Sequence, residues 1–305
     1  MMSKFEASTT STRGRKLNTV CILGGGHGLE ASIRAALQIA EEVTAVVSVA
    51  DDGGSSGRLR EMFGLIPPGD MRRCMASFLP NESSMKQIIE YRFQEGEFKD
   101  HALGNLIFLA ALDVLGSTCR ASEFMTELFG VSGRVLPTSE EPLTLCARLQ
   151  DGREIRGQVH VHLSRDIDQV WVEPASLTAP QETVAAIEGA DLVLLGPGSL
   201  FTSVLAAAVV PSVREALCRA KGKVVFIGNL KQQPNETLGL TMTEQILAVS
   251  RHEIRFDAVV LDNTLISDVR SEEIDQEIVF SELANLTGAS HDATLLAKIL
   301  ESTFL

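Results

Sequence analysis

Residues 43–59, VTAVVSVADDGGSSGRL, constrain the fold more than any other segment of the chain. The segment begins as an almost continuously apolar, valine-rich run, which predicts a strand covered by helices on both faces of a parallel sheet. Asp51 and Asp52 then precede two glycines, two serines and an arginine. Carboxylates are costly to remove from water without a partner, and adjacent glycines cost conformational entropy. The segment therefore predicts a buried strand that ends in a site.

The same order of strand, loop and helix recurs along the chain. An apolar strand at 19–23 ends in glycines, and the helical spacing at 29–39 joins it to 43–49 as a βαβ unit. Further strands are expected at 191–195, 224–227 and 258–261, and further helices at 85–93, 104–115, 200–210, 213–219 and 242–249. We also expect an antiparallel hairpin from 143–149 and 155–163, with its turn at Asp151 and Gly152.

These elements predict an α/β fold, a Rossmann-like doubly wound and mostly parallel sheet with a helical and β-hairpin insertion at 59–173. Residues 1–18 are polar and are expected to be a disordered leader, and 19–305 a single domain. The formal charge of −13 opposes nucleic-acid binding. Five cysteines without a CxxC pair indicate a cytoplasmic protein. No apolar run approaches the roughly 20 residues that membrane insertion needs.

Polar, glycine-rich segments follow four of the expected strands, at 24–28, 51–58, 196–203 and 229–237. In doubly wound sheets, ligands bind beyond the carboxyl ends of the strands. We therefore expect these four loops to converge on one site.

The first loop lies between a strand and a helix, where backbone amides and the helix dipole can contact a phosphate. It contains neither GxGxxG nor a P-loop. More glycines are present than a tight turn needs, so the loop predicts a phosphate nest. Its candidate residues are Gly24, Gly25, Gly26, His27 and Gly28.

Asp51 and Asp52 fit two kinds of chemistry, recognition of ribose hydroxyls or binding of Mg²⁺ together with ligand phosphates. A solvated turn is the structural alternative. Neighbouring amides, hydroxyls and a guanidinium extend the candidate site to Gly53, Gly54, Ser55, Ser56 and Arg58.

Three later segments add candidates. Asp70 could cap the following helix, and Arg72 or Arg73 could reach a second phosphate. The third strand end predicts a seat for an anion or diphosphate at a helix N-terminus. The candidates in these segments and in the loop at 229–237 are Asp70, Arg72, His101, Asn105, Gly196, Pro197, Gly198, Ser199, Thr202, Ser203, Asn229 and Thr237.

Three of the histidines have structural explanations. His101 and Asn105 are spaced to share a helix face, although an isolated histidine is usually structural. His160 and His162 alternate with apolar residues, which predicts the exposed face of a strand. The pair could bind a metal, but no third ligand is evident, and the structural explanation is favoured. The residues alone thus indicate a nucleotide or phosphosugar pocket with a cation, and they leave the reaction open.

The motifs, in this order, resemble a known family. GGGHGLEASIRAAL, VSVADDGGSSGRLR, PPGDMRRC, HALGNLIFLAAL, VLPTSEEPLTL with DGREIRGQ, and GPGSLFTSVLA are similar to those of the gluconeogenesis-factor (YvcK-like) branch of the 2-phospho-L-lactate transferase (CofD-like) superfamily. The resemblance covers residues 19–263, and the pair His291 and Asp292 fits the family's C-terminal helix.

The resemblance implies a Rossmann-like fold and a nucleotide-linked ligand. In this branch the implied function is a cytoplasmic, non-catalytic regulator that binds UDP-N-acetylglucosamine and supports cell shape and envelope growth on gluconeogenic carbon. The alternative that it implies is a Mg²⁺-dependent phospholactyl-type transferase acting on a nucleoside-diphosphate adduct. A homodimer and proteins of cell-envelope synthesis are the implied protein partners.

Two positions depart from the family pattern. His27 replaces the usual threonine, which removes a hydroxyl contact to phosphate. No tyrosine follows Asn263, where related UDP-sugar binders have an aromatic residue. Stacking of the base is therefore expected to be weaker, or to come from Phe256 or Phe280.

Overall fold

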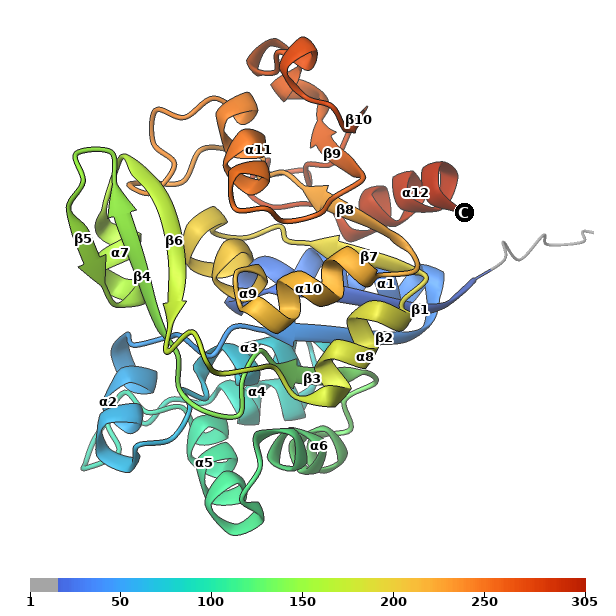
Figure 1. The fold of residues 1–305 in the computed structure, drawn as a ribbon. Helices are drawn as coiled ribbons and strands as arrows, with labels where there is room; N and C mark the ends of the chain where they lie inside the picture. Colours follow the sequence, from blue (N-terminus) through green and yellow to red (C-terminus); the bar gives the residue numbers. More distant parts are fainter. Residues whose placement is uncertain (1–15) are drawn as a thin grey trace, which may run out of the picture.

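Seven parallel strands form the main sheet, in a computed structural model that describes residues 16–305 (Figure 1). In chain order they are β1 (Leu17–Gly24), β2 (Ala40–Val47), β3 (Arg134–Pro137), β7 (Leu192–Leu195), β8 (Lys223–Ile227), β9 (Ala258–Asp262) and β10 (Glu277–Ser281). Their spatial order is β10-β9-β8-β7-β1-β2-β3. The strand order therefore reverses between β1 and β7, as in a Rossmann fold. This confirms the predicted fold class.

Helices cover both faces of this sheet. Figure 1 shows α8 (Gln181–Gly189) and α10 (Pro211–Arg219) on one face, and α1 (Glu30–Ile39) with α12 (Ala293–Phe304) on the other. Further α-helices are α2 (Gly54–Phe63), α3 (Gly69–Phe78), α4 (Ser84–Glu90), α5 (Leu103–Leu115), α6 (Thr118–Phe129), α7 (Gln158–Leu163), α9 (Ala206–Ala208) and α11 (Met242–Arg251). The other helical turns are η1 (Gly26–Leu29), the π-helix η2 (Leu200–Leu205), η3 (Asn263–Asp268) and η4 (Ser271–Glu273).

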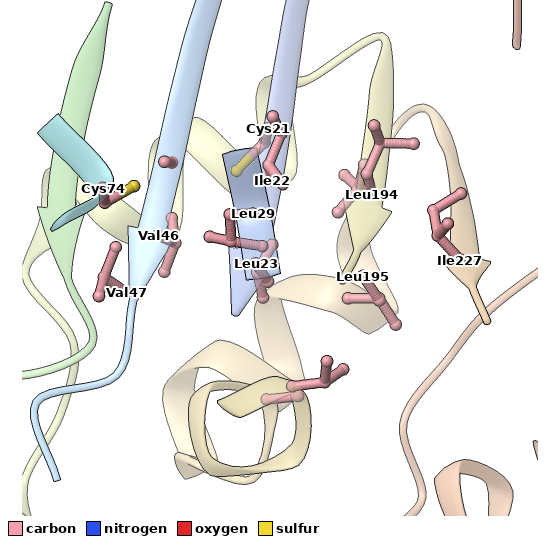
Figure 2. Packing of buried hydrophobic residues seen from close by; sticks show 14 of the residues in the cluster. Cys21, Ile22, Leu23, Leu29, Val46, Val47, Cys74, Leu194, Leu195 and Ile227 are labelled. Atoms are coloured by element: carbon pink, nitrogen blue, oxygen red, sulfur yellow. The ribbon is translucent and has the colours of Figure 1, made fainter. Parts of the chain in front are cut away.

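The core lies on the central strands of the main sheet. Ile22 pairs in register with Ala45 on one side and with Leu194 on the other, and all three are fully buried. Figure 2 shows the side chains of neighbouring strands packed around Leu23 and Leu195. Continuous apolar runs are buried here because helices exclude water from both faces. The strand ends are thereby fixed, and so are the loops that follow them.

A second, antiparallel sheet has the order β5-β4-β6, with β4 (Thr144–Leu149), β5 (Glu154–Arg156) and β6 (Ile167–Glu173). The predicted hairpin is confirmed, but its second strand ends at Arg156. Residues that were expected to continue it form the helix α7 (Gln158–Leu163). The prediction that His160 and His162 lie on a strand is therefore wrong.

The cause of this difference is tertiary. The Asp52 carboxylate accepts a hydrogen bond of 2.9 Å from the backbone amide of Val159, and an amide in the first turn of a helix has no partner within the helix. Gly157, at φ 98°, lets the chain leave β5 and enter this turn. The alternation of valine and histidine in the sequence indicates neither the hydrogen bond from Val159 to Asp52 nor the conformation of Gly157.

Two predicted boundaries also shift. The predicted insertion at 59–173 contains β3, which pairs with β2 at the edge of the main sheet, so it is only partly an insertion. The predicted leader falls mostly on residues 1–15, outside the described residues, whereas β1 already begins at Leu17.

Within residues 16–305, no single helix is long and apolar enough to cross a membrane. The bent helix pair Leu200–Ala208 and Pro211–Arg219, at 73°, meets the length and composition test only when its two parts are taken together.

Candidate functional site

A cavity of about 670 Å³ opens at the carboxyl ends of β1, β7 and β8. It lies where the strand order reverses, which is the usual ligand position in a doubly wound sheet. Three of the four predicted loops contribute to it. The predicted residues that line it are Gly25, Gly26, Gly28, Pro197, Gly198, Ser199, Ser203 and Asn229.

The loops after β1 and β7 touch at the floor of this cavity. A Cβ atom on Gly28 would lie 2.6 Å from the Cα of Gly198 and 2.7 Å from the carbonyl oxygen of Pro197. Both neighbours are backbone atoms, so the contact requires glycine. Ser32 reinforces it, because its hydroxyl donates a 2.7 Å hydrogen bond to the carbonyl oxygen of Gly196.

Two arginines supply positive charge to the cavity, Arg34 from α1 and Arg73 from α3. The Arg34 guanidinium is held by Glu30, 3.0 Å from Nε, and by Asn81, 2.7 Å from Nη2. Burial raises the pKa of Glu30, but Lys86 and Arg34 outweigh this effect and lower it, so Glu30 is a stable counter-ion. The hydrogen bonds of Arg34 within the described part of the structure use Nε and Nη2, which leaves Nη1 as a donor for an anionic ligand.

Arg73 also joins the cavity to a buried acid pair. Its Nη2 lies 3.5 Å from the Asp51 carboxylate and contacts that of Asp70, and only 7% of Asp51 and 4% of Asp70 are exposed. Burial and the charge of Asp70 raise the pKa of Asp51 to about 6. Asp70 also approaches Gly25, where a Cβ atom would lie 3.1 Å from its Oδ2. The guanidinium of Arg73 and the carboxylates of Asp51 and Asp70 therefore lie together beside the glycine loop at 24–28.

The carboxylate that faces Asp51 is that of Asp70 and not, as the sequence had indicated, that of Asp52. Asp52 points to α7, where it accepts the Val159 amide. Among the described side chains, which do not include that of His27, no three histidine, cysteine or acidic groups are placed to hold a metal ion. The Asp52 carboxylate is thus engaged at α7, whereas the carboxylates of Asp51 and Asp70 both contact Arg73 and supply two hard oxygen donors.

A second group of predicted residues forms a buried hydrogen-bond chain behind the loop at 51–58. The Ser55 hydroxyl lies 2.9 Å from Nδ1 of His101 and accepts a 3.3 Å bond from the Asn105 amide. Arg72 Nε donates to the Asn105 carbonyl at 3.0 Å. Burial and the positive charge of Arg58 lower the pKa of His101. None of these residues lines the cavity, so these hydrogen bonds support the loop at 51–58 from the side away from the cavity.

The predicted anion seat after β7 is already filled by the protein. Glu236 is 1% exposed, and its carboxylate accepts hydrogen bonds from the amides of Phe201 at 3.1 Å and Thr202 at 3.2 Å. It also accepts the Thr202 hydroxyl. Because these amides and the hydroxyl face Glu236, they do not face a ligand. The prediction that Thr202 binds an anion is corrected accordingly.

The loop at 229–237 fastens the loop at 196–203 at three further points. The Asn229 side chain exchanges hydrogen bonds with the backbone of Gly198, at 3.3 and 2.8 Å. Gln233 accepts the Leu200 amide at 3.2 Å and donates to the Ser199 hydroxyl at 3.0 Å. The Thr237 hydroxyl accepts the Gln233 amide at 2.7 Å, so Thr237 supports this loop and does not line the cavity.

A segment that was missing from the list of candidates closes the cavity. It runs from Asn285 to Ala293 and places Ser290, His291 and Asp292 on the wall. Asp262, at the end of β9, holds its start by accepting the amides of Leu283 at 2.8 Å and Ala284 at 3.2 Å. In the sequence, the pair His291 and Asp292 matched the family's C-terminal helix, but this match did not indicate that the segment contacts a ligand.

The other predicted residues lie around the cavity and not on its wall. Gly24 ends β1 and accepts the Ser48 amide, and Ser56 lies against Gly69, where a Cβ atom would meet its hydroxyl. Those that also do not line the cavity are Gly53, Gly54, Arg58 and Gly196, and the side chain of the predicted residue His27 lies outside the described part of the structure. Cavity residues absent from the candidates are Glu30, Ala31, Arg34, Asn81, Gln233, Asn285, Ala289, Ser290, His291, Asp292 and Ala293.

Seven parallel strands in Rossmann order, with a polar cavity at the switch point, define a Rossmann-like α/β protein. The family model described as 2-phospho-L-lactate transferase CofD matches residues 20–299, and the chain belongs to this family. The predicted family resemblance is thus confirmed.

Known proteins place the chain more finely within that family. The gluconeogenesis factor of Bacillus subtilis is 36% identical over 261 residues, which are 85% of this chain and 80% of that protein. A relative from Clostridium acetobutylicum is 36% identical over 255 residues, and the match spans 56% of its length. The crystal structure of a UPF0052-family protein from Bacillus halodurans has a TM-score of 0.88 and 29% identity, covering 94% of this chain and 99% of that one.

Proposed function

We propose that the chain binds a nucleoside diphosphate sugar of the UDP-N-acetylglucosamine kind and acts as a cytoplasmic regulatory factor. The observation that carries the proposal is the cavity at the switch point, which combines Arg34 and Arg73 with the hydroxyls of Ser203 and Ser290. Its volume of about 670 Å³ suits one ligand of this size. The arginines suit a diphosphate, and the serine hydroxyls suit sugar hydroxyls.

Magnesium enters this proposal as a partner of the diphosphate. In proteins it is commonly held by one or two carboxylates together with ligand phosphates. Asp51 and Asp70 fit that requirement, because they face each other next to the glycine loop and share only Arg73 as a cation. Bound there, Mg²⁺ would neutralise charge on both the diphosphate and the acid pair.

Calorimetric titration with UDP-N-acetylglucosamine, UDP-glucose, GDP and NAD, with Mg²⁺ and with a chelator, tests the binding. We expect heat with the UDP-sugars, stronger when Mg²⁺ is present. Arg34→Gln should weaken the binding about tenfold, because a charge-assisted contact is lost. Arg148→Gln is the control, since Arg148 is exposed on the small sheet. Absence of heat with either UDP-sugar at millimolar concentration would overturn the proposal.

A transferase is the second candidate, and the buried Asp51 and Asp70 next to the cavity favour it. Incubation with a lactyl nucleoside-diphosphate adduct, Mg²⁺ and an alcohol acceptor should then join the phospholactyl group to the acceptor oxygen, break the diphosphate bond and release a nucleoside monophosphate and a proton. Asp51→Asn should abolish this release. Wild-type protein that binds the adduct and forms no product would exclude this candidate.

The proposed regulatory role concerns cell shape and envelope growth on gluconeogenic carbon, through contacts with proteins of cell-envelope synthesis or through a homodimer. Deletion of the gene should impair growth on a gluconeogenic carbon source, and the Arg34→Gln variant should fail to restore it. Full restoration by a variant shown not to bind nucleotide would separate the cellular role from this cavity.

A further inference from the structure

Among the described side chains that line the cavity, a set that does not include His27, the imidazole of His291 is the one aromatic ring. The two phenylalanines expected to stack on a base do not reach it. Phe256 is 4% exposed and packs edge-to-face on Phe226, with ring centroids 6.4 Å apart. Phe280 lies on β10 and packs against the hydrophobic core. A nucleobase in this cavity would therefore meet His291 as its planar neighbour.

The protonation of this ring follows from its hydrogen bond. His291 Nε2 lies 3.0 Å from the carbonyl oxygen of Gly228. A carbonyl oxygen only accepts, so Nε2 carries the proton. Burial lowers the pKa of His291, against the opposing effects of Gly228 and Asp262, which favours the neutral ring. Nδ1 is then an acceptor, and it has no hydrogen-bond partner in the described part of the chain.

The ring is also held in place. The next residue, Asp292, caps α12 by accepting the amides of Thr294 at 2.8 Å and Leu295 at 3.0 Å. Asp292 also donates its own amide to the carbonyl oxygen of Leu283 at 2.7 Å. A fixed acceptor discriminates between ligands better than a mobile one, because less order is lost on binding.

His291 and the two arginines come from different walls of the same cavity. Arg34 and Arg73 project from α1 and α3, whereas His291 follows β10 and lies two residues before the start of α12. The helix α12 packs against α1, as Figure 1 shows, and this packing brings the two walls together. One nucleotide can therefore place its diphosphate at the arginines and its base at His291.

We infer that His291 selects the nucleobase by accepting a ring N–H at Nδ1. This inference rests on the proposed function and adds its specificity. Uracil and guanine carry a ring N–H on the edge that pairs, whereas cytosine and adenine carry a lone pair at the corresponding nitrogen. The ligand is therefore a uridine or guanosine diphosphate derivative. Cytidine and adenosine diphosphates would place the lone pair of a ring nitrogen against the lone pair of His291 Nδ1, which is repulsive.

Two substitutions separate recognition of the base from support of the fold. His291→Gln retains an N–H donor at the distance of Nε2, for Gly228, and removes the Nδ1 acceptor. His291→Asn retains an oxygen acceptor at the distance of Nδ1 and removes the donor to Gly228. Calorimetry with UDP, GDP, CDP and ADP, and thermal unfolding of each variant, give the two readouts.

We expect the wild type to bind UDP or GDP at least about tenfold more tightly than CDP or ADP. His291→Gln should reduce that ratio to below about threefold without lowering the unfolding midpoint, and His291→Asn should keep part of the ratio. Equal affinities in the wild type, a preference for CDP or ADP, an unchanged ratio in His291→Gln, or equal losses in both variants would each overturn the inference. If the wild type binds no nucleotide, the proposed function itself fails.

Discussion

Replacing Gly28 with alanine should weaken both the fold and the ligand site. The new Cβ atom would lie 2.6 Å from the Cα of Gly198, whereas ordinary contacts of this kind begin at 3.4 Å. It would also lie 2.7 Å from the carbonyl oxygen of Pro197. The overlap is thus about 0.8 Å with the Cα of Gly198 and about 0.7 Å with the carbonyl oxygen of Pro197. Both are backbone atoms, so no side chain can rotate to relieve it.

The expected cost follows from that geometry. Overpacking of a buried contact typically costs about 1–3 kcal/mol, and here the relief requires the loops after β1 and β7 to separate. Gly28 does not have a positive φ, so backbone strain adds nothing to the effect. Separation of the loops would also displace Gly25 and Ser199 on the cavity wall, so we expect the UDP-sugar affinity to fall at least about tenfold for a displacement near 1 Å.

Urea unfolding followed by circular dichroism measures the first effect, and calorimetry the second. Gly189→Ala is the matched control, because a Cβ atom there meets nothing within 4 Å and the residue ends α8 without a positive φ. Its free energy of unfolding should stay constant or rise by up to about 1 kcal/mol. If Gly28→Ala matched the wild type in both assays, the contact between the two loops would not define the site.

Three further predictions concern charged and titrating groups. Asp51→Asn, in metal-free buffer, should raise the free energy of unfolding at pH 7 by about 1–3 kcal/mol, because burial and Asp70 raise the pKa of Asp51 to about 6. This gain should vanish as the pH falls from 6 to below 3.8, where Asp51 is neutral in both the folded and the unfolded chain. The His252 ring is buried and accepts a hydrogen bond of 2.8 Å from a backbone amide of β6, and burial lowers its pKa below 6.5. At acidic pH the unfolded chain therefore binds a proton at His252 more readily than the folded chain does, so wild-type stability should decrease relative to His252→Gln as the pH falls below 6.5. A stability difference that stays constant with pH in urea titrations would contradict this. Glu236→Gln should cost about 1–3 kcal/mol by leaving buried amides poorly paired, whereas Glu140→Gln, which alters an exposed cap on α6, should cost less than about 1 kcal/mol in the same assay.

The architecture was largely predictable because its causes are local. Each of β1, β2, β7, β8 and β9 is a short apolar run, and the order of strand, loop and helix identifies a parallel sheet. Strand ends of such a sheet lie along one edge, so convergence of the loops at 24–28, 196–203 and 229–237 followed from topology. The helix α7 was not predictable, because its first turn depends on the Asp52 carboxylate from a distant loop.

The candidate site was predictable in part, for a related reason. Glycines next to strand ends indicate close approach of backbone, and Gly28 against Gly198 is such an approach. Long polar side chains carry no comparable signal. Nothing in the sequence distinguishes Glu236, which fills the helix N-terminus after β7, from an exposed glutamate. Nor does it show that Asp51 faces Asp70 and that Asp52 does not.

The sequence by itself determined the fold class, the family and the edge of the sheet where a ligand would bind, because hydrophobic periodicity and glycine-rich turns act over short distances. Only the tertiary structure decided which polar groups face the cavity. It assigned Glu236 to the protein's own amides, turned Asp52 to α7, and brought His291 from the far end of the chain to the cavity wall. The physical reason is that a buried polar group needs a partner, and the sequence does not specify which distant segment supplies it.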